Sequence, residues 1–467
     1  MSRSSTAALA SIAVAVSSIA LLQNLVIPLV PLIQAEFGVT ADAASWAMTS
    51  WLIAAAVATP TLGRIGDLRG RRTVFLLTIG VVAIGDVLAA IAPSLGVLIV
   101  ARVLQGIGGA LFPLAFGLLR DALPRERVTG AIGVVSAVIG IGGAAGTVLA
   151  GPISDLLGWR GTFALPFVVA LLGALLTAVV VRDPGTRAAG RVNLLSSLLL
   201  SGWLVALLIP LSAGARWGWT APATLGSFAL AALAFAAWIV AELRAAEPLV
   251  DLRLMMSPAI WPANTASLLF GVGVFAFWGY LPQFLELSPD AGGIGLSVRD
   301  AGLALVPMLI GMSGVGFAAG ALNRILSLRT MLAAGAVLMG ASAASAVLAH
   351  SSVWPLALAG AGFGIGCGLA YAASAAIVVQ GVPADRIGVA TGVNANLRTI
   401  GSAIGSAATG AIVFGASPHG TGPGFVASWV IVAAVTTAAG ILVWAVRPRR
   451  ARPATGAVVV PELVDAA

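Results

Sequence analysis

The sequence predicts an all-α polytopic membrane protein with fourteen membrane-spanning helices. Of its 467 residues, 59% are hydrophobic and only 9% are charged, and the mean hydropathy is +1.05. A water-soluble fold needs far more polar surface than this. Long apolar stretches recur along the whole chain, and the 25 basic residues, all of them arginine, lie mainly in short clusters between those stretches. Composition, apolar repeats and charge clustering therefore agree on the class.

Each predicted span is an apolar stretch long enough to cross a bilayer, for which about 17–25 residues suffice. The loops between the stretches are short, so we expect no separate soluble domain. In the first half of the chain the spans run near Ala7 to Gln34, Ser45 to Leu62, Thr73 to Ala92, Leu95 to Leu119, Val128 to Ser154, Trp159 to Val181 and Leu194 to Ala213. In the second half they run near Pro222 to Ala241, Pro258 to Phe284, Asp300 to Leu322, Thr330 to Ala349, Val353 to Gln380, Ile387 to Phe414 and Gly424 to Val446.

The arginines predict the orientation of these spans, because segments that stay in the cytoplasm carry an excess of positive charge. With both termini inside, only Arg160, Arg216 and Arg299 fall in outer loops, and Arg102 and Arg398 fall within spans. All other arginines are then cytoplasmic. An odd number of spans would destroy this asymmetry. We therefore predict a multi-pass protein of the cell membrane with both termini in the cytoplasm.

The sequence disfavours three other features: a secretory signal peptide, a nucleic-acid partner and a disulfide bond. The apolar run from Ala7 to Gln34 is longer than the core of a secretory signal peptide, and more such runs follow. The net charge of +8 would indicate nucleic acid in a soluble chain, but here membrane topology explains it, so we expect no nucleic-acid partner. Cys367 is the only cysteine, which excludes an intrachain disulfide.

The densest group of charges follows the second predicted span. Arg64, Asp67, Arg69, Arg71 and Arg72 lie within ten residues that begin at Gly63 and include Gly70. This order of glycine, aspartate, glycine and paired arginines resembles the signature loop between transmembrane helices 2 and 3 of the major facilitator superfamily of secondary transporters. The sequence thus points to that family of transporters.

The resemblance implies that this loop gates the inner side. Asp67 is expected to pair with Arg71 and to sit at the positive N-terminal end of the helix that starts near Ile387, while Asp121 completes the network. The gate residues are then Gly63, Asp67, Gly70, Arg71, Arg72 and Asp121. The alternative is that these charges are solvated anchors that only fix the topology.

Two further motifs extend the resemblance to the 14-helix branch of drug and proton antiporters. Arg102 and Gln105, followed by Gly106 and Gly108, are similar to the family's R-x-x-Q-G-x-G motif. The fifth span is similar to the antiporter motif G-x-x-x-G-P-x-x-G-G, which it matches at Gly142, Gly146 and Gly151, with Pro152 directly after it. It departs from that motif at Thr147, which stands in place of proline, and at Ala150, which stands in place of glycine.

The resemblance implies a major facilitator fold of six, two and six helices. We expect an N-terminal six-helix bundle at residues 1–181, an inserted helix pair with cytoplasmic linkers at 182–257 and a C-terminal six-helix bundle at 258–446. Residues 447–467 are predicted to form a disordered cytoplasmic tail.

Proton coupling is assigned to Arg102, Gln105, Asp86 and Arg398. A guanidinium within the bilayer costs at least about 2.5 kcal/mol, so both arginines need a wet cavity or a partner. The aspartate that this branch usually carries in its first helix is missing, because Leu22 occupies that position. Asp86 is the acid deepest within a span, and it is either a structural partner of a neighbour or the proton carrier. Arg398 either contributes to the site or bonds backbone carbonyls at a broken helix.

The two buried arginines and the shortage of acids at mid-membrane predict a neutral or positive cavity for a neutral or anionic, largely apolar cargo. Polar and aromatic residues are the candidate contacts, although each aromatic alone is more typical of packing. They are Gln23, Asn24, Trp51, Trp261, Asn264, Trp278, Tyr280, Tyr371 and Asn394.

The resulting hypothesis is a monomeric secondary transporter that exports small molecules such as drugs, antibiotics or secondary metabolites by proton antiport through alternating access. Its partners are the small molecule, protons and lipid. We expect no cofactor and no metal, since no P-loop occurs and the two histidines lie 69 positions apart. A proton-coupled importer and an uncoupled facilitator are the alternatives, and an intramembrane enzyme is disfavoured because no hydrolase motif is present.

Overall fold

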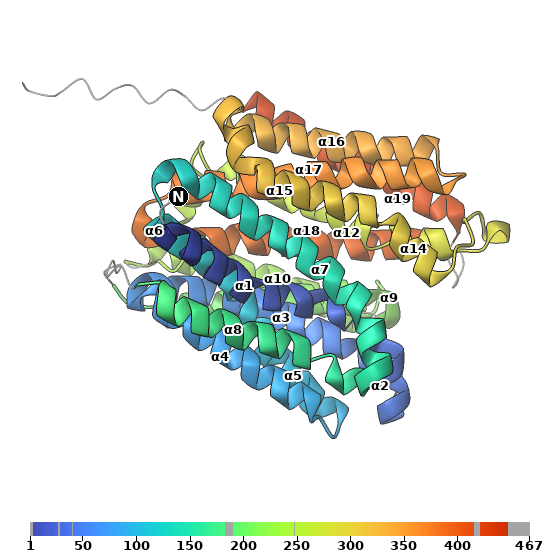
Figure 1. The fold of residues 1–467 in the computed structure, drawn as a ribbon, viewed down its shortest axis with the longest axis horizontal. Coiled ribbons are helices and arrows are strands. Elements are labelled where there is room, and N and C mark those ends of the chain that lie inside the picture. Colours follow the sequence, from blue (N-terminus) through green and yellow to red (C-terminus); the bar gives the residue numbers. More distant parts are fainter. Residues whose placement is uncertain are drawn as a thin grey trace, which may run out of the picture.

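The computed structural model describes residues 3–26, 29–39, 41–182, 190–246, 248–414 and 421–446. Every regular element in these ranges is a helix and none is a strand, which confirms the all-α class (Figure 1). The first eight α-helices are α1 (Arg3–Leu25), α2 (Val30–Phe37), α3 (Ala41–Arg69), α4 (Arg71–Ala90), α5 (Leu95–Gly106), α6 (Leu111–Ala122), α7 (Arg125–Gly161) and α8 (Ala164–Val180), with the 3₁₀ turn η2 (Ile107–Ala110) between α5 and α6.

The second part of the chain follows the same pattern. Its α-helices are α9 (Leu194–Trp217), α10 (Pro222–Arg244), α11 (Leu252–Met255), α12 (Trp261–Trp278), α13 (Leu281–Glu286), α14 (Val298–Ala304), α15 (Val306–Ile325), α16 (Leu328–Leu348), α17 (Val353–Gly381), α18 (Ile387–Phe414) and α19 (Gly422–Ala445). Two 3₁₀ turns, η3 (Pro289–Ala291) and η4 (Ala384–Arg386), precede α14 and α18.

Twelve helical segments of the described chain are long and apolar enough to cross a membrane, and a bent pair brings the number to thirteen. The pair joins Leu149–Gly161 to Ala164–Val180 at 83°, and Gly158 within α7 adopts a φ of 72°. The predicted span Ser45–Leu62 lies in α3, which is outside this set. Fourteen spans therefore stay a prediction, whereas a multi-pass membrane protein is established.

The first predicted span differs from the structure. We expected one stretch from Ala7 to Gln34, but α1 ends at Leu25 and α2 is a separate helix. Pro28 and Pro31 lack the amide hydrogens that a continuous helix would need.

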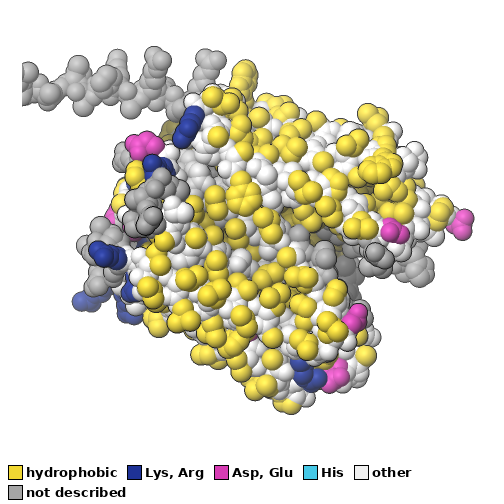
Figure 2. Space-filling view, viewed as in Figure 1, with side chains coloured by type: hydrophobic (Ala, Val, Ile, Leu, Met, Phe, Trp, Pro, Cys, Tyr) yellow, Lys and Arg dark blue, Asp and Glu magenta, His cyan; other side chains and the backbone are white. Residues whose placement is uncertain are grey.

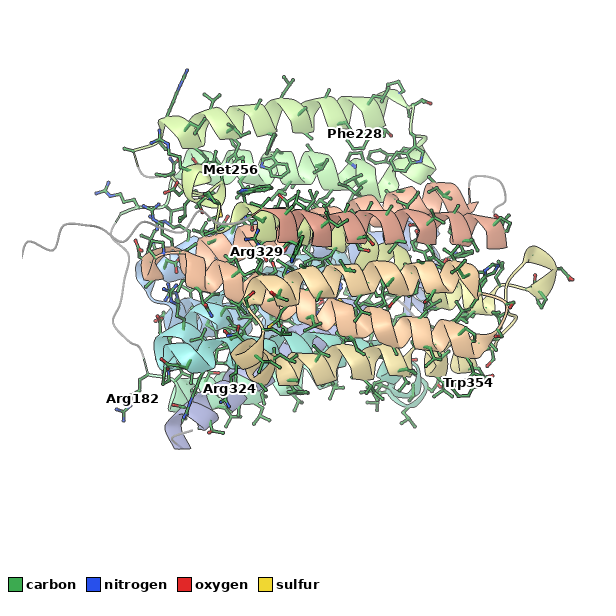
Figure 3. The ribbon with its side chains drawn as sticks, turned by 90° about the horizontal axis from the view of Figure 1, so that it is seen from above. Arg182, Phe228, Met256, Arg324, Arg329 and Trp354 are labelled. Atoms are coloured by element: carbon green, nitrogen blue, oxygen red, sulfur yellow. The ribbon has the colours of Figure 1, made fainter. Side chains whose placement is uncertain are left out.

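The helices form two bundles, and the buried apolar core of the first bundle extends onto residues of α17 and α18. In the first bundle, α1 packs on α7 and α8, and α3 packs on α5. In the second, α16 packs on α17 and α19, and α12 packs on α18. The bundles meet where α3 contacts α18 and where α7 contacts α15. The helices α9 and α10 pair with each other at the side of the molecule, and α9 touches both α3 and α18 (Figure 3).

The two seams between the bundles depend on glycine. A Cβ atom built on Gly63 of α3 would lie 2.4 Å from the carbonyl oxygen of Gly388 on α18. One built on Gly133 of α7 would lie 2.3 Å from the carbonyl oxygen of Gly316 on α15. Small residues let membrane helices approach this closely, and dispersion then stabilises the contact. Each seam is therefore a backbone-to-backbone contact.

The surface separates apolar from charged side chains. Hydrophobic side chains cover most of the face in Figure 2, while the dark blue arginines gather mainly at one end. Arg182, Arg324 and Arg329 lie at that same end in Figure 3, and Trp354 lies at the other. We call the first the basic end; α3 ends there at Arg69 and α4 begins there at Arg71.

Packing of α12 on α18 yields a testable prediction. A Cβ on Gly401 of α18 would lie 2.0 Å from the carbonyl oxygen of Leu268 on α12, whereas one on Gly314 of α15 meets no atom within 4 Å. Gly401→Ala should lower the free energy of unfolding by about 1–3 kcal/mol, the usual cost of overpacking. Gly314→Ala is the control and should leave it unchanged or higher. Thermal unfolding in detergent measures both; equal melting temperatures would contradict the packing.

Candidate functional site

The charged loop at the basic end is a tight connection between two helices. Gly70 alone separates α3 from α4, and its φ of 103° lies in the region that favours glycine. Gly66 lies one turn earlier, where a Cβ would meet a methyl carbon of Leu114 at 2.3 Å. This turn brings Arg71 back over the last turn of α3, next to Asp67.

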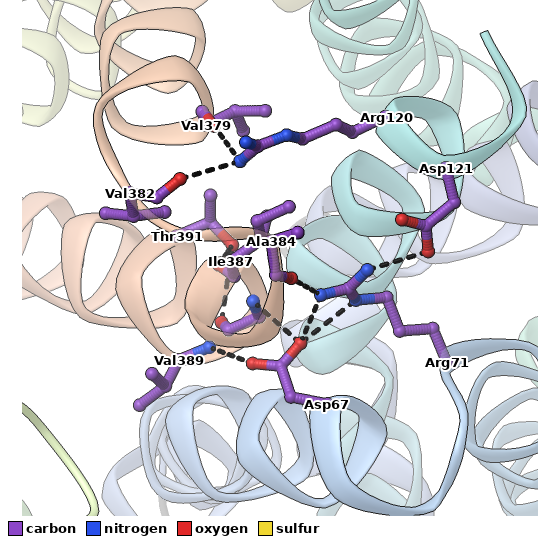
Figure 4. Close-up of polar contacts among 11 residues, drawn as sticks. Asp67, Arg71, Arg120, Asp121, Val379, Val382, Ala384, Ile387, Val389 and Thr391 are labelled. Atoms are coloured by element: carbon purple, nitrogen blue, oxygen red, sulfur yellow. Dashed lines mark hydrogen bonds and ion pairs between the residues drawn. The ribbon is translucent and has the colours of Figure 1, made fainter. Parts of the chain in front are cut away.

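Arg71 is the centre of a buried ion-pair network, which we call the gate network. Its Nε and Nη2 donate to one carboxylate oxygen of Asp67 at 2.9 and 2.7 Å, and its Nη1 donates to Asp121 at 2.7 Å. Arg71 is 5% exposed and Asp67 is 2% exposed. Arg71 Nη2 also donates to the carbonyl of Ala384, in the turn before α18 (Figure 4). The guanidinium thereby joins the first bundle to the second.

Asp67 closes the same contact from the other side. Its two carboxylate oxygens accept hydrogen bonds from the backbone amides of Gly388, at 3.2 Å, and Val389, at 3.3 Å. These amides belong to the first turn of α18, where the unpaired N–H groups and the helix dipole favour an anion. The close approach of Gly63 to Gly388 brings the carboxylate within reach.

Further side chains at the basic end strengthen this junction. Arg120, at the end of α6, donates to the carbonyls of Val379 and Val382 at the end of α17 (Figure 4). Gln380 Nε2 donates to Thr129 Oγ1 of α7 at 2.8 Å. Arg72 behaves differently, because it donates to the carbonyl of Ala178 at 2.6 Å and so stays within the first bundle.

Sequence reasoning missed two of the charged contacts. Nothing in the sequence near Arg120 predicts its carbonyl acceptors, which lie 259 and 262 positions away. The ion pair of Arg386 with Asp251 was also missed. It ties the linker before α12 to the turn before α18, and only the placement of Asp251 directly ahead of an apolar span hinted at an inner-surface contact.

A second polar group lies deep in the first bundle. Gln105 Nε2 donates to Asp86 Oδ1 at 2.8 Å, and Arg102 Nη1 donates to Gln105 Oε1 at 2.7 Å. Arg102 Nε donates to the carbonyl of Ala47 on α3 at 2.8 Å, and the guanidinium lies 5.8 Å from the Trp51 ring. Asp86 and Arg102 are each 1% exposed, and Asp86 Oδ2 has no hydrogen-bond partner within the described chain.

A small cavity lies between the bundles, next to the gate network, and we call it the central cavity. It is lined by Phe112, Pro113, Phe116, Ser136, Tyr371, Ala375, Thr391, Asn394, Ala395 and Arg398. The Arg398 guanidinium lies 4.2 Å from the centroid of the Tyr371 ring, a cation–π contact. Asn394 Nδ2 donates to Ser267 at 2.9 Å and to Asn264 at 3.0 Å. The structure thus places Tyr371, Asn394 and Arg398 together.

The other predicted contact residues lie in several places. Trp51 lies on Arg102, and Trp261 and Asn264 line a different cavity, beside α9 and α10. Tyr280 donates to the carbonyl of Ser406 at 3.0 Å, near the end opposite the basic one. Trp278 packs at the edge of the second core, and Gln23 is exposed near the end of α1. The side chain of Asn24 lies outside the described set.

The predicted antiporter motif lies on the contact of α7 with α1. Cβ atoms built on Gly142 and Gly146 would lie 2.4 Å from Ala20 Cβ and 2.3 Å from the carbonyl oxygen of Leu21. Gly151 has no atom within 4 Å of its built Cβ, and Pro152 lies inside α7. The first two glycines therefore allow close helix contact. Within the described residues, no group of three or more His, Cys, Asp or Glu side chains could hold a metal.

Comparisons with known proteins agree with this architecture. A family model described as Major Facilitator Superfamily matches residues 12–292. The tetracenomycin C resistance and export protein of Streptomyces glaucescens is 30% identical over 414 residues, which cover 87% of this chain and 75% of that protein. The cephamycin export protein CmcT of Amycolatopsis lactamdurans is 32% identical over 314 residues, which cover 66% of this chain and 64% of that protein.

Other relatives are longer, and solved structures show the same fold. Four mycobacterial relatives, among them a multidrug resistance protein B homolog, are matched over only 44–53% of their own length. The human organic anion transporter MFSD10 has a TM-score of 0.70 at 15% identity, with 94% of this chain and 99% of that one covered.

The gate network predicts how fast the first turn of α18 exchanges its amide hydrogens. Asp67→Asn keeps the shape of the side chain but removes the charge that holds Arg71 and attracts the Gly388 and Val389 amides. We expect exchange in this turn to become about tenfold faster, equivalent to losing about 1.4 kcal/mol. Asp385→Asn is the control, because Asp385 is an exposed acid beside the same turn. Equal exchange in both variants, measured by mass spectrometry, would contradict the role of Asp67.

Proposed function

Because this chain belongs to the major facilitator superfamily of membrane transporters, we propose that it exports small, largely apolar molecules by proton antiport through alternating access. The observation that carries the proposal is the gate network. It joins the two bundles at the basic end through hydrogen bonds and ion pairs, which can break and re-form. The named functions of the relatives, resistance to and export of tetracenomycin C and cephamycin export, supply the direction and class of cargo.

The proposal assigns the basic end to the cytoplasm, following the excess of arginine there. Both termini then lie in the cytoplasm, and the membrane is the cell membrane. With the gate network formed, the two bundles are closed against each other at the basic end, so the network has to open before cargo can enter from the cytoplasm. Hydrogen bonds to charged groups contribute about 1.5–3 kcal/mol each, which suits a contact that must open in every cycle.

Proton coupling is proposed for the group formed by Asp86, Gln105 and Arg102. Leu22 occupies the usual acid position and is fully buried, so the first helix offers no titratable group there. Asp86 is the acid with a free oxygen beside Gln105. When Asp86 takes up a proton, the group formed by Asp86, Gln105 and Arg102 loses its negative charge, and the positive charge of Arg102 is no longer balanced. Arg102 also holds the carbonyl of Ala47 on α3, so the loss of that charge would act on the helix that carries Asp67.

Arg398 and Asn394 are proposed as cargo contacts in the central cavity. The positive charge of Arg398 over the Tyr371 ring and the amide of Asn394 favour neutral or anionic molecules over cations. Tyr371 and Phe112 supply flat apolar surface of the kind that most ligand sites use. The protein is proposed to work as a monomer, since each bundle supplies half of this cavity.

Two alternatives keep the fold and change the coupling. A proton-coupled importer would run the same cycle in reverse, and a facilitator would move cargo without protons. Thr147 and Leu22, which depart from the antiporter pattern, are the observations that favour them.

Everted membrane vesicles with an acidic interior test the coupling. Addition of a cargo should release protons from wild-type vesicles, as reported by a pH-sensitive dye. Asp86→Asn and Arg102→Ala should each reduce cargo-dependent release at least about tenfold, since each removes a group on which the proton step depends. Asp155→Asn, at an exposed acid, is the control. Cargo movement without proton release in the wild type would favour the facilitator.

The charge of the central cavity predicts which compounds are exported. Neutral and anionic aromatic compounds should release protons from the vesicles, whereas a bis-quaternary dye should not, because a dication near Arg398 is repelled in a medium of low dielectric. Arg398→Gln should weaken export of the anionic compounds more than that of the neutral ones. Equal export of the bis-quaternary dye and a neutral antibiotic would contradict the proposed cargo class.

A further inference from the structure

A second cavity lies outside the central one, at the side of the molecule. Its volume is about 290 Å³, close to the lower end of the range for small-molecule sites. We call it the lateral cavity. Its walls come from α3, α9, α10, α12, α18 and the linker that contains α11, and its lining includes Leu200, Trp203, Trp238, Met255, Asn264 and Leu268.

The wall supplied by α9 and α10 is aromatic and held in place. Trp203 lies 5.0 Å from Phe235 and 6.0 Å from Trp238, measured between ring centroids. Trp238 Nε1 donates to the buried Glu242 at 3.0 Å, which fixes the orientation of that ring. The Nε1 of Trp203 is buried and has no acceptor within the described chain. The wall therefore offers flat apolar surface and one unused N–H donor.

The opposite wall carries amides that lead toward the central cavity. Asn264 of α12 lines the lateral cavity, and its Oδ1 accepts from Nδ2 of Asn394, which lines the central cavity. This bond of 3.0 Å joins side chains that face two separate spaces. Asn396 Nδ2 donates at 2.7 Å to the carbonyl of Ala56, whose usual helical donor is absent because Pro60 has no N–H. Among the residues that the structure describes, none with a charged side chain lines the cavity.

The exposed apolar part of the lining, which we take as the mouth of the lateral cavity, lies toward the basic end. Met256 is 70% exposed and Phe235 is 40% exposed, whereas Trp238 and Met255 behind them are buried. Met256 lies between the inserted helices and the rest of the molecule in Figure 3, on the side of Arg324 and Arg329. Trp238 precedes Arg244, the end of α10, by six residues, or about 9 Å at 1.5 Å per residue. The mouth is thus at the depth of one leaflet.

We propose that the lateral cavity is an entry site at which neutral, ring-bearing apolar molecules leave the cytoplasmic leaflet before they reach the central cavity. The proposal rests on the proposed export function and gives the inserted pair a role, because α9 and α10 supply the aromatic wall. Burying a charge among these side chains without a partner would be unfavourable, so the occupant is neutral. The volume admits a small molecule of one or two rings, and the Trp203 N–H suits a carbonyl on it.

For a molecule to move from the lateral to the central cavity, the hydrogen bond between Asn264 and Asn394 then has to break. Both amides are buried, and a ligand carbonyl could replace the lost partner as it passes. Asn394 belongs to α18, whose first turn is held by the gate network, so opening of the gate would also shift this partition. Loading from the leaflet is therefore linked to the cytoplasm-facing conformation.

Photolabelling with benzophenone tests the site. Benzophenone is a neutral ketone with two rings that inserts into nearby C–H bonds when irradiated. The purified protein in phosphatidylcholine nanodiscs should be labelled saturably at Met255 and Met256, read by peptide mass spectrometry. Leu200→Trp should fill the cavity and reduce this labelling about tenfold. Leu198→Trp, on the same helix but 64% exposed where Leu200 is 3% exposed, should not.

A second variant and a transport measurement separate the outcomes. Leu268→Phe reduces the volume of the lateral cavity from the α12 side. It provides a second test of the site if a melting curve shows that Leu200→Trp is misfolded. In everted vesicles, Leu200→Trp should slow export of a membrane-partitioned neutral compound about tenfold and leave a water-soluble anionic compound unchanged. Labelling that does not saturate, or that both cavity variants leave unchanged, would overturn the proposal, and so would equal slowing of the two compounds. Saturable labelling in a protein that exports nothing would instead refute the export function and leave the binding site standing.

Discussion

The arrangement of the two bundles depends on one buried guanidinium. Arg71 binds Asp67 and Asp121 of its own bundle and the carbonyl of Ala384 in the other, while Asp67 binds two amides at the start of α18. Removing one partner of such a buried pair leaves an uncompensated charge and typically costs about 3–5 kcal/mol. The network is therefore strong enough to close one end and, because it consists of few polar bonds, able to dissociate when cargo or a proton favours the other state.

Helix α3 connects this network to the other polar sites. Near its first residues it meets Arg102 through the carbonyl of Ala47, near its middle it meets Asn396 through the carbonyl of Ala56, and at its end it carries Asp67. Ala47 and Asp67 are 20 residues apart, or about 30 Å along a helix. A single helix, although interrupted by Pro60, that touches the proposed proton site at one end and the gate at the other is a physical element that both can bias.

The sequence predicted the helices and the contacts between residues that are close together in the chain. The turn at Gly70 returns the chain on itself, so Asp67 and Arg71 are adjacent whatever the rest of the fold does, and apolar length predicted the helices. Residues far apart in the chain were less predictable. The acceptors of Arg120, the amide pair of Asn264 with Asn394 and the aromatic wall from Trp203 to Trp238 exist only once the bundles are packed. Gln23 was predicted as a cavity residue from its polarity, but which face of α1 is exposed depends on how that helix packs, and Gln23 lies on the exposed face.

The most direct test of the account is a pair of electron-paramagnetic distance measurements in a Cys367→Ser background. One spin-label pair, at Glu126 and Ser327, reports the basic end, and the other, at Asp155 and Asp290, reports the opposite end; all four residues are exposed. If Arg71 holds the basic end closed, Arg71→Gln should lengthen the first distance and shorten the second. Unchanged distances at both ends, or lengthening at both, would contradict the claim that this network controls alternating access.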